Sequence, residues 1–180
     1  DRIRRCGRAA APALSDLIEK AGERTKILAA NELSLLSPGE AVPVLLKAIG
    51  AAKDNARREF RRALSTAAKS ERAKSALADA LVPEAFQSLS EVVKIDLLRA
   101  IGPRLGSIDG SAKAFSTLAL KGAPFRTRYL LQVPAAELAR AGDAQALSFL
   151  QSSLRGDPDP HVRLKAAEAA ARVPALISDL

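Results

Sequence analysis

A nine-residue pattern recurs five times along the chain, over residues 25–33, 56–64, 93–101, 125–133 and 162–170. Each copy begins with a small or apolar residue and then a basic one. Apolar residues return at the fifth and ninth positions of every copy, and at the sixth position of every copy except the second, where Arg61 stands. The basic residues, Lys26, Arg57, Lys94, Arg126 and Arg163, are 31, 37, 32 and 37 positions apart. A period of this length is typical of helical repeat arrays, in which each unit buries its apolar face against its neighbours. The spacing therefore predicts an array of repeated helical units.

Composition indicates that these units are helical. Hydrophobic residues make up 48% of the 180 residues, and aromatic residues only 3%. Most of the apolar residues are Ala and Leu, which favour helices, whereas the β-branched and aromatic residues that strands favour are scarce. No apolar run approaches the roughly 20 residues needed to cross a bilayer. We therefore expect an all-α, soluble chain without a transmembrane segment, with the cytoplasm slightly favoured as its compartment.

A second apolar segment lies between consecutive copies, which makes each unit an antiparallel helix pair. The predicted helices cover residues 9–21, a segment beginning near 23, 38–49, 56–69, 71–81, 83–89, 92–105, 111–120, 124–140, 144–154 and 161–172, and residue 174 opens a sixth pair. Ser37 is expected to cap its helix in a capping box with Glu40, and Asp143 to cap the helix that follows it. Pro134 is expected to bend or break its helix. About five antiparallel pairs follow, in one α-solenoid over residues 1–180 that we expect to be part of a longer array.

The segment over residues 157–170, DPDPHVRLKAAEAA, resembles the turn and second helix of a HEAT repeat, in particular the bacterial form also called PBS-lyase HEAT-like. This last unit carries the motif most strongly, while the rest of the chain follows the pattern. The resemblance implies a right-handed superhelix of stacked helix pairs, whose second helices line the concave side. The fourth unit departs from the family pattern, because no acidic residue stands in the turn before Arg126.

Acidic residues precede four of the five basic residues of the pattern. These acids are Glu23, Asp54, Glu91 and Asp159. Three of them lie three positions before their basic residue, and Asp159 lies four before Arg163, so that acid and base would meet across the first helical turn. Each acid also stands where it can cap its helix. HEAT repeats are similar in using a turn Asp and the following Arg to tie adjacent units, so we expect a structural ladder of these acids with Lys26, Arg57, Lys94, Arg126 and Arg163.

Six further basic residues form the candidate partner-binding set: Arg58, Arg61, Arg62, Arg99, Arg128 and Lys165. The first three surround the apolar line of the second copy, and the others could extend the same surface along later units. The formal charge of +8 favours acidic partners. Two interpretations stay open, an ordinary solvated face and a basic surface on the concave side that binds an acidic ligand.

The sequence contains no pattern for catalysis or metal binding. His161 is the only histidine and Cys6 the only cysteine, so neither a zinc site of ordinary ligand count nor an internal disulfide can form. Cys6 is expected to be a small buried residue, and His161 an exposed one in the first turn of its helix. Glycine-rich phosphate-binding loops are absent. We predict no enzyme activity, no metal, no cofactor and no small-molecule substrate.

The leading hypothesis is a noncatalytic protein–protein interaction scaffold that binds an acidic macromolecular partner on a basic concave face. The alternative is nucleic-acid binding through phosphate contacts, as in HEAT-like DNA glycosylases. The chain has no Trp and one Tyr, which leaves few aromatic platforms for bases. A third hypothesis, attachment of a bilin chromophore, is implied only by the name of the PBS-lyase repeats, and the scarcity of aromatic residues and of histidine disfavours it.

Overall fold

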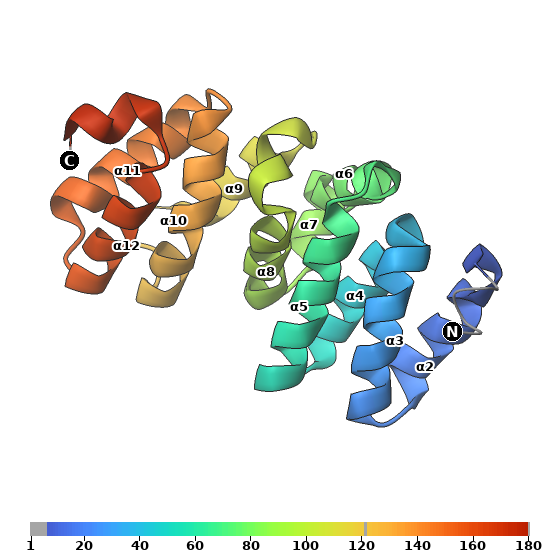
Figure 1. Ribbon diagram of the computed structural model, residues 1–180. Helices are drawn as coiled ribbons and strands as arrows, with labels where there is room; N and C mark the ends of the chain where they lie inside the picture. The colour runs from blue at the N-terminus through green and yellow to red at the C-terminus, as the bar shows by residue number, and fades with distance from the viewer. Residues whose placement is uncertain (1–6, 121, 180) are drawn as a thin grey trace. The chain divides into compact units, whose positions relative to one another are not determined.

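The computed structural model describes the backbone of residues 7–120 and 122–179, together with their side chains except those of residues 7, 8, 54 and 177–179. The prediction for Cys6 therefore lies outside the described residues. Over the described chain the fold is all-α, with eleven α-helices, four short 3₁₀ helices and no strand (Figure 1). This confirms the predicted fold class. Within the same residues, no helix combines the length and the apolar character that a bilayer crossing requires.

The chain divides into two compact units. Unit 1 contains Asp1–Ala80 and Glu84–Ile101, and unit 2 contains Leu81–Pro83 and Gly102–Leu180. The predicted single array over residues 1–180 stays a prediction.

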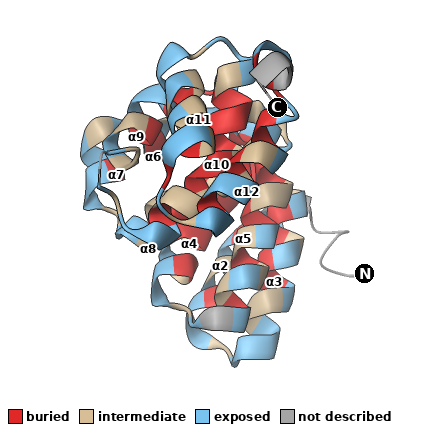
Figure 2. Cartoon of the chain, turned by 90° about the vertical axis from the view of Figure 1, so that its left-hand side faces the viewer, coloured by how far each residue is buried: buried red, intermediate tan, exposed pale blue. Residues whose placement is uncertain are grey.

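Unit 1 is formed by helices that pack in the order of the chain. Its elements are η1 (Gly7–Ala10), α2 (Ala11–Lys20), α3 (Glu23–Leu36), α4 (Pro38–Ala51), α5 (Asp54–Ala68), η2 (Glu71–Ala73) and α8 (Glu91–Ile101). It also contains α6 (Lys74–Leu81) and α7 (Pro83–Ser88) except for Leu81 and Pro83, which belong to unit 2. Sequential neighbours pack as hairpins, α2 with α3 and α4 with α5. In addition α3 packs against α5 and α5 against α8, while α2 packs against α4. The apolar positions of the recurring pattern lie in these contacts, where Leu33, Phe60, Leu64 and Leu97 are buried (Figure 2).

Unit 2 contains η3 (Gly102–Ser107), α9 (Ser111–Leu118), α10 (Phe125–Arg140), α11 (Ala144–Gly156), α12 (Pro160–Ala170) and η4 (Pro174–Asp179). α10 packs against α11, α12 and η3, and α11 packs against α12. Leu131, Leu150 and Val162 are fully buried between them. Phe115 of α9 meets Phe149 of α11 edge to face, with ring centroids 5.4 Å apart, an arrangement that aromatic pairs prefer.

The predicted capping box at Ser37 is wrong. Ser37 does precede α4, but its hydroxyl makes no hydrogen bond to the helix, and its ψ of 67° lies outside the extended region. The Ser37 N–H already donates to the Leu33 carbonyl at the end of α3, at 2.9 Å. Because one residue both ends α3 and precedes α4, this N–H is already used and does not donate to the Glu40 carboxylate, as a capping box requires.

Two other helices end at residues different from those that the prediction implied. Pro134, expected to bend or break its helix, lies inside α10, which continues to Arg140. A proline costs about 3 kcal/mol in a helix interior, and the packing of α10 on three neighbouring elements offsets this cost. The helix predicted over residues 92–105 is α-helical only to Ile101, because Gly102 has a φ of +53° and the chain continues as the 3₁₀ helix η3.

One further helix differs from its prediction, and one predicted helix cap agrees with the structure. The helix expected to open at Pro174 is the 3₁₀ helix η4. The predicted cap at Asp143 is confirmed, since its Oδ1 accepts the Ala146 N–H at 2.7 Å.

Candidate functional site

Three arginine side chains of unit 1 surround the buried carboxylate of Asp96. The Asp96 side chain, on α8, is only 9% exposed, and its Oδ1 accepts a hydrogen bond from Arg61 Nη1 of α5 at 3.1 Å. Arg99 Nη1 lies 3.6 Å from the same oxygen, and Arg57 Nε lies 4.0 Å from Oδ2. We call these four residues the Asp96 cluster. Asp96 is therefore a carboxylate shared by three guanidinium groups.

Helical spacing explains why these side chains meet. Arg57 and Arg61 are four residues apart on α5, and Asp96 and Arg99 are three apart on α8, so each pair lies on one side of its helix. α5 and α8 pack against each other, which brings the two pairs together. The three arginine side chains are 22%, 26% and 30% exposed, so their apolar stems are largely covered while the cluster still meets solvent.

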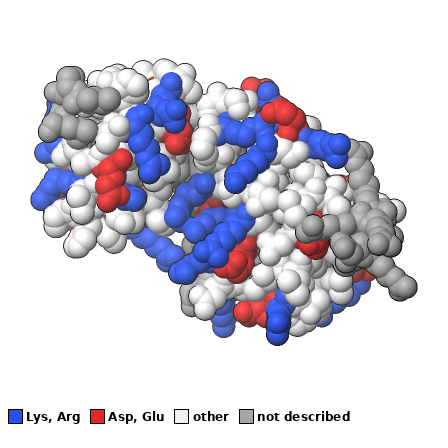
Figure 3. Space-filling model, in the orientation of Figure 1, with Lys and Arg blue, Asp and Glu red and all other residues white. Residues whose placement is uncertain are grey.

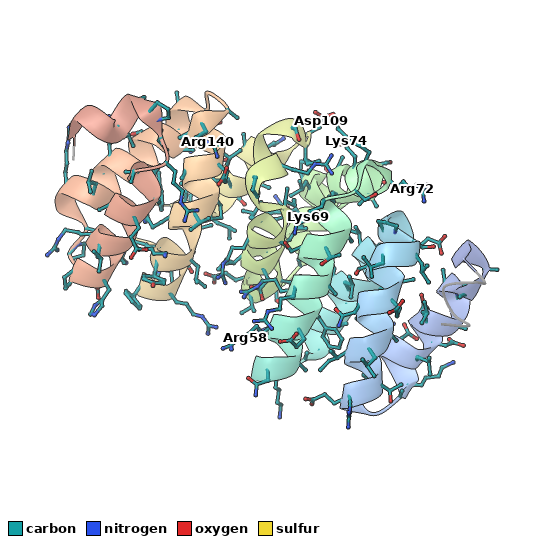
Figure 4. The ribbon with its side chains drawn as sticks, in the orientation of Figure 1. Arg58, Lys69, Arg72, Lys74, Asp109 and Arg140 are labelled. Atoms are coloured by element: carbon teal, nitrogen blue, oxygen red, sulfur yellow. The ribbon has the colours of Figure 1, made fainter. Side chains whose placement is uncertain are left out.

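Two more arginines of α5 extend this charge outward. Arg58 is exposed and extends from α5 into solvent (Figure 4). Arg62 pairs with Glu59 at 2.6 Å, yet its side chain remains 65% exposed. Figure 3 shows the resulting concentration of basic side chains over α5 and α8, with acidic atoms among them. We call Arg57, Arg58, Arg61, Arg62 and Arg99 the α5–α8 basic surface.

The two predicted binding residues of unit 2 have partners within that unit. Arg128 of α10 forms a two-point contact with Asp157, Nε to Oδ2 at 2.7 Å and Nη2 to Oδ1 at 3.1 Å, and its Nη1 donates to the Ala123 carbonyl. Lys165 of α12 pairs with Glu168 at 2.6 Å. Neither side chain therefore points freely at a partner.

Among the ion pairs of the described side chains of unit 2, that of Asp157 has the least exposed carboxylate. Its side chain is 5% exposed, and its Oδ1 also accepts the Asp159 N–H at 3.0 Å. The hydrogen bond from Arg128 lowers the pKa of Asp157, and the Asp159 N–H and the charge of Arg163 lower it further. The same contact with Asp157 raises the pKa of Arg128. This pair joins the turn before α12 to α10.

Two of the predicted acid–base contacts do not form among the described side chains. Lys26 donates to the Glu19 carbonyl at 2.8 Å and not to Glu23. Arg163 donates to the Asp157 carbonyl at 2.7 Å and not to the Asp159 carboxylate. Asp159 instead caps α12, because its Oδ1 accepts the His161 N–H at 2.8 Å. Its capping role is therefore as predicted, while its predicted partner is different.

The remaining members of the predicted ladder are less uniform than the sequence pattern. The Lys94 ammonium lies over the Phe86 ring, 5.7 Å from its centroid, which is a cation–π distance. Arg126 is exposed on α10. Glu91 is the first residue of α8, and Asp54 is the first residue of α5, with its side chain outside the description.

Sequence reasoning missed three buried acids, Asp96, Glu137 and Asp157. Asp96 stands inside an otherwise apolar run, two residues after Lys94, and an acid at such a position must have a buried partner. Asp157 was read as part of the turn motif with no partner of its own. A charged residue within an apolar stretch was the available signal for Asp96.

The described residues contain no group of three or more His, Cys, Asp or Glu side chains that could hold a metal ion. The His161 side chain is 76% exposed, with Nδ1 3.3 Å from Asp159 Oδ1. A pair this open to water has none of the enclosure that perturbs catalytic groups.

Comparison of this chain with protein-family models and with curated proteins finds no match. The function of the α5–α8 basic surface therefore has to be inferred from its own geometry and charge.

Proposed function

We propose that the chain is a noncatalytic interaction scaffold, a HEAT-like α-solenoid that binds an acidic protein partner through the α5–α8 basic surface. The observation that carries this proposal is the charge of that surface. Over α5 and α8 together, six basic residues stand against four acidic ones, which leaves a net charge of +2 on two adjacent helices. Such a concentration of one sign attracts ligands of the other and suppresses partners of like charge.

Asp96 stabilises this concentration of positive charge. Its buried carboxylate offsets repulsion among Arg57, Arg61 and Arg99, and it holds the Arg61 guanidinium by a hydrogen bond. A guanidinium that is already ordered loses less side-chain entropy when a partner binds. It also offers several N–H donors in a plane, a geometry that matches a carboxylate. The cluster thus favours ligands that carry Asp or Glu side chains.

The order of helix packing supports the solenoid part of the proposal. α3, α5 and α8 pack side by side in unit 1, as do α10 and α12 in unit 2. These are the helices of the recurring pattern, and stacked helix pairs require such contacts between successive second helices. In a right-handed stack of about five pairs, these helices would line the concave side and carry the basic surface.

Nucleic-acid binding is a second candidate, favoured by one observation in unit 2. Phe125 is 47% exposed, and its ring lies 5.9 Å from that of Tyr129 at a tilt of 35°, next to the exposed Arg126. A base could stack on this pair. One aromatic pair offers a single stacking platform, so phosphate contacts would have to supply most of the affinity.

The test is a quantitative pull-down from a lysate of the source cells, with and without nuclease. The variant is Arg58→Glu/Arg62→Glu, which leaves Arg61 in place because a glutamate there would face Asp96 and destabilise unit 1. The matched control is Lys113→Glu/Arg172→Glu, the same change of charge at exposed positions of unit 2. All three proteins should keep the same helical circular dichroism.

The proposal predicts that a protein partner is still recovered after nuclease treatment. The control should recover the same partner, and the Arg58/Arg62 variant should not. A bound fraction that nuclease removes, and whose affinity falls steeply with salt, would establish the second candidate instead. Partner recovery that is equal for all three proteins would refute both.

A further inference from the structure

The first two hairpins of unit 1, α2–α3 and α4–α5, leave a hollow of about 600 Å³ between them. Its lining comes from the C-terminal parts of α2 and α4 and the N-terminal parts of α3 and α5. The hollow therefore lies at the end of unit 1 where each hairpin turns. We call it the hairpin hollow. Its volume is within the range of small-molecule sites, about 300–1,000 Å³.

Small side chains keep this space open, and larger apolar ones form its inner wall. Five of the thirteen lining residues are alanines: Ala21, Ala48, Ala51, Ala52 and Ala56. An alanine extends only one carbon beyond the backbone, so the two hairpins do not fill the gap. The buried side chains of Ile18 and Phe60 and the half-buried Val44 complete the apolar lining. A hydrocarbon group placed here would contact apolar atoms and lose contact with water.

The charged side chains of the hairpin hollow carry a small excess of positive charge. Three lysines, Lys26, Lys47 and Lys53, stand with two acids, Glu19 and Glu23, which gives a net charge of +1 for the lining residues. Lys47 Nζ pairs with the Glu19 carboxylate at 2.7 Å, so these two charges offset each other. Glu23 is the first residue of α3, where the N–H groups of the helix end offset part of a negative charge.

Two ammonium groups of the hollow are left for a ligand. Lys26 Nζ donates to the main-chain carbonyl of Glu19 at 2.8 Å, a contact that does not neutralise its charge. Lys53 is exposed and has no ion pair among the described side chains. The hollow thus combines an apolar wall with two lysines that can receive one anionic group.

We propose that the hairpin hollow binds an amphipathic organic monoanion, a medium-chain carboxylic acid in its ionised form. Its alkyl chain lies against Ile18 and Phe60, and its carboxylate lies on the ammonium groups of Lys26 and Lys53. A small inorganic anion would leave the apolar wall uncovered, and an alkyl ammonium ion would meet charge of its own sign. The site shares no residue with the α5–α8 basic surface, so this inference does not depend on the proposed function.

The test titrates hexanoate, octanoate and decanoate, each below its micelle concentration, into the isotope-labelled chain and follows its amide NMR signals. Octanol and octylamine keep the chain length of octanoate and change its charge. Ala51→Phe and Ala48→Leu fill the hollow from α4, and Lys53→Glu reverses one charge. The matched controls are Ala144→Phe and Lys113→Glu, at exposed positions of unit 2. Circular dichroism and thermal unfolding establish that each variant is folded.

Octanoate should shift the amide signals of lining residues such as Ala52 and Ala56, and its affinity should rise about two- to fourfold with each added methylene. Octanol should bind more weakly than octanoate, and octylamine more weakly still. Lys53→Glu should weaken octanoate about threefold or more and leave octanol unchanged. Each filling variant should weaken octanoate about tenfold, because it displaces the contacts of about two methylenes. Both controls should bind as the wild type does.

Several results would overturn the inference. Equal affinities for octanoate and octanol would show that the lysines contribute nothing, and equal affinities for the three acids would show that the apolar wall contributes nothing. Binding that both folded filling variants leave unchanged would place the ligand elsewhere, and a titration that shifts no lining amide would show that no site exists. If neither filling variant folds, the response of octanoate and octanol to Lys53→Glu decides the question alone.

Discussion

Replacing Asp157 with Asn should destabilise unit 2 by about 2–3 kcal/mol. Asn keeps the shape of the side chain and one acceptor oxygen, but it removes the negative charge that faces Arg128 at two points, 2.7 and 3.1 Å away. Breaking a fully buried pair costs about 3–5 kcal/mol, because the remaining charge is stranded. Arg128 retains 21% exposure, so water can solvate part of its charge and the expected loss lies below that range.

The assay is thermal and urea unfolding followed by circular dichroism at pH 7. For a domain of 60–100 residues, the expected loss corresponds to a fall in Tm of about 10–20 °C. The matched control is Glu168→Gln, which removes the partner of Lys165 from a pair whose side chains are 29% and 54% exposed. This surface pair should contribute at most about 1 kcal/mol.

The pH dependence supplies a second readout of the same pair. The pKa of Asp157 is lowered in the folded state, mainly by the hydrogen bond from Arg128. In the unfolded state an Asp side chain has its reference pKa of about 3.9. The stabilisation is thus fully present above the unfolded pKa and is lost as pH falls through the folded pKa. The difference between wild type and Asp157→Asn should therefore be largest near neutral pH and shrink in strong acid. Equal stability of the two proteins at pH 7, or a difference that grows toward low pH, would refute this reasoning.

Three further changes test other parts of the structure by urea unfolding. Ser37→Ala should leave stability unchanged or raise it slightly, because the buried Ser37 hydroxyl has no hydrogen-bond partner; a loss near the 1 kcal/mol of an ordinary N-cap would contradict the structure. Gly106→Ala should cost about 1–3 kcal/mol because its new Cβ would meet that of Ala141, while Gly156→Ala, with open space around it, should cost nothing. Asp96→Asn should cost about 2 kcal/mol, less at high salt, because the three surrounding arginines then repel each other; a loss below about 0.5 kcal/mol would show that they are well solvated.

Periodicity predicted the helices well because apolar spacing alone decides which segments can bury a face. The helices of the recurring pattern all form, and buried residues such as Leu33, Leu64 and Val162 occupy its apolar positions. Helix ends were less predictable, because backbone geometry decides them locally. Ser37 has the residue type of an N-cap, but its N–H is used by the preceding helix, and this competition is invisible in a four-residue motif.

The candidate site was predicted only in its residue types. Composition pointed to Arg58, Arg61 and Arg62 as a basic face, and the structure divides them between two roles. Arg61 turns toward the buried Asp96 on α8, 35 positions away in sequence, while Arg58 faces solvent. Which side of α5 meets α8 depends on tertiary packing, and no local rule on sequence spacing reports it.

Site-specific photo-crosslinking from α5 tests the central claim most directly. A benzoylphenylalanine at Ser65 would lie on the same side of α5 as Arg58 and Arg62, and one at the exposed Ser75 of α6 serves as the control. The account predicts a nuclease-resistant protein adduct from position 65, absent from position 75 and abolished by Arg58→Glu/Arg62→Glu. Adducts that are equal at both positions, or that persist in the arginine variant, would contradict a partner bound on the α5–α8 basic surface.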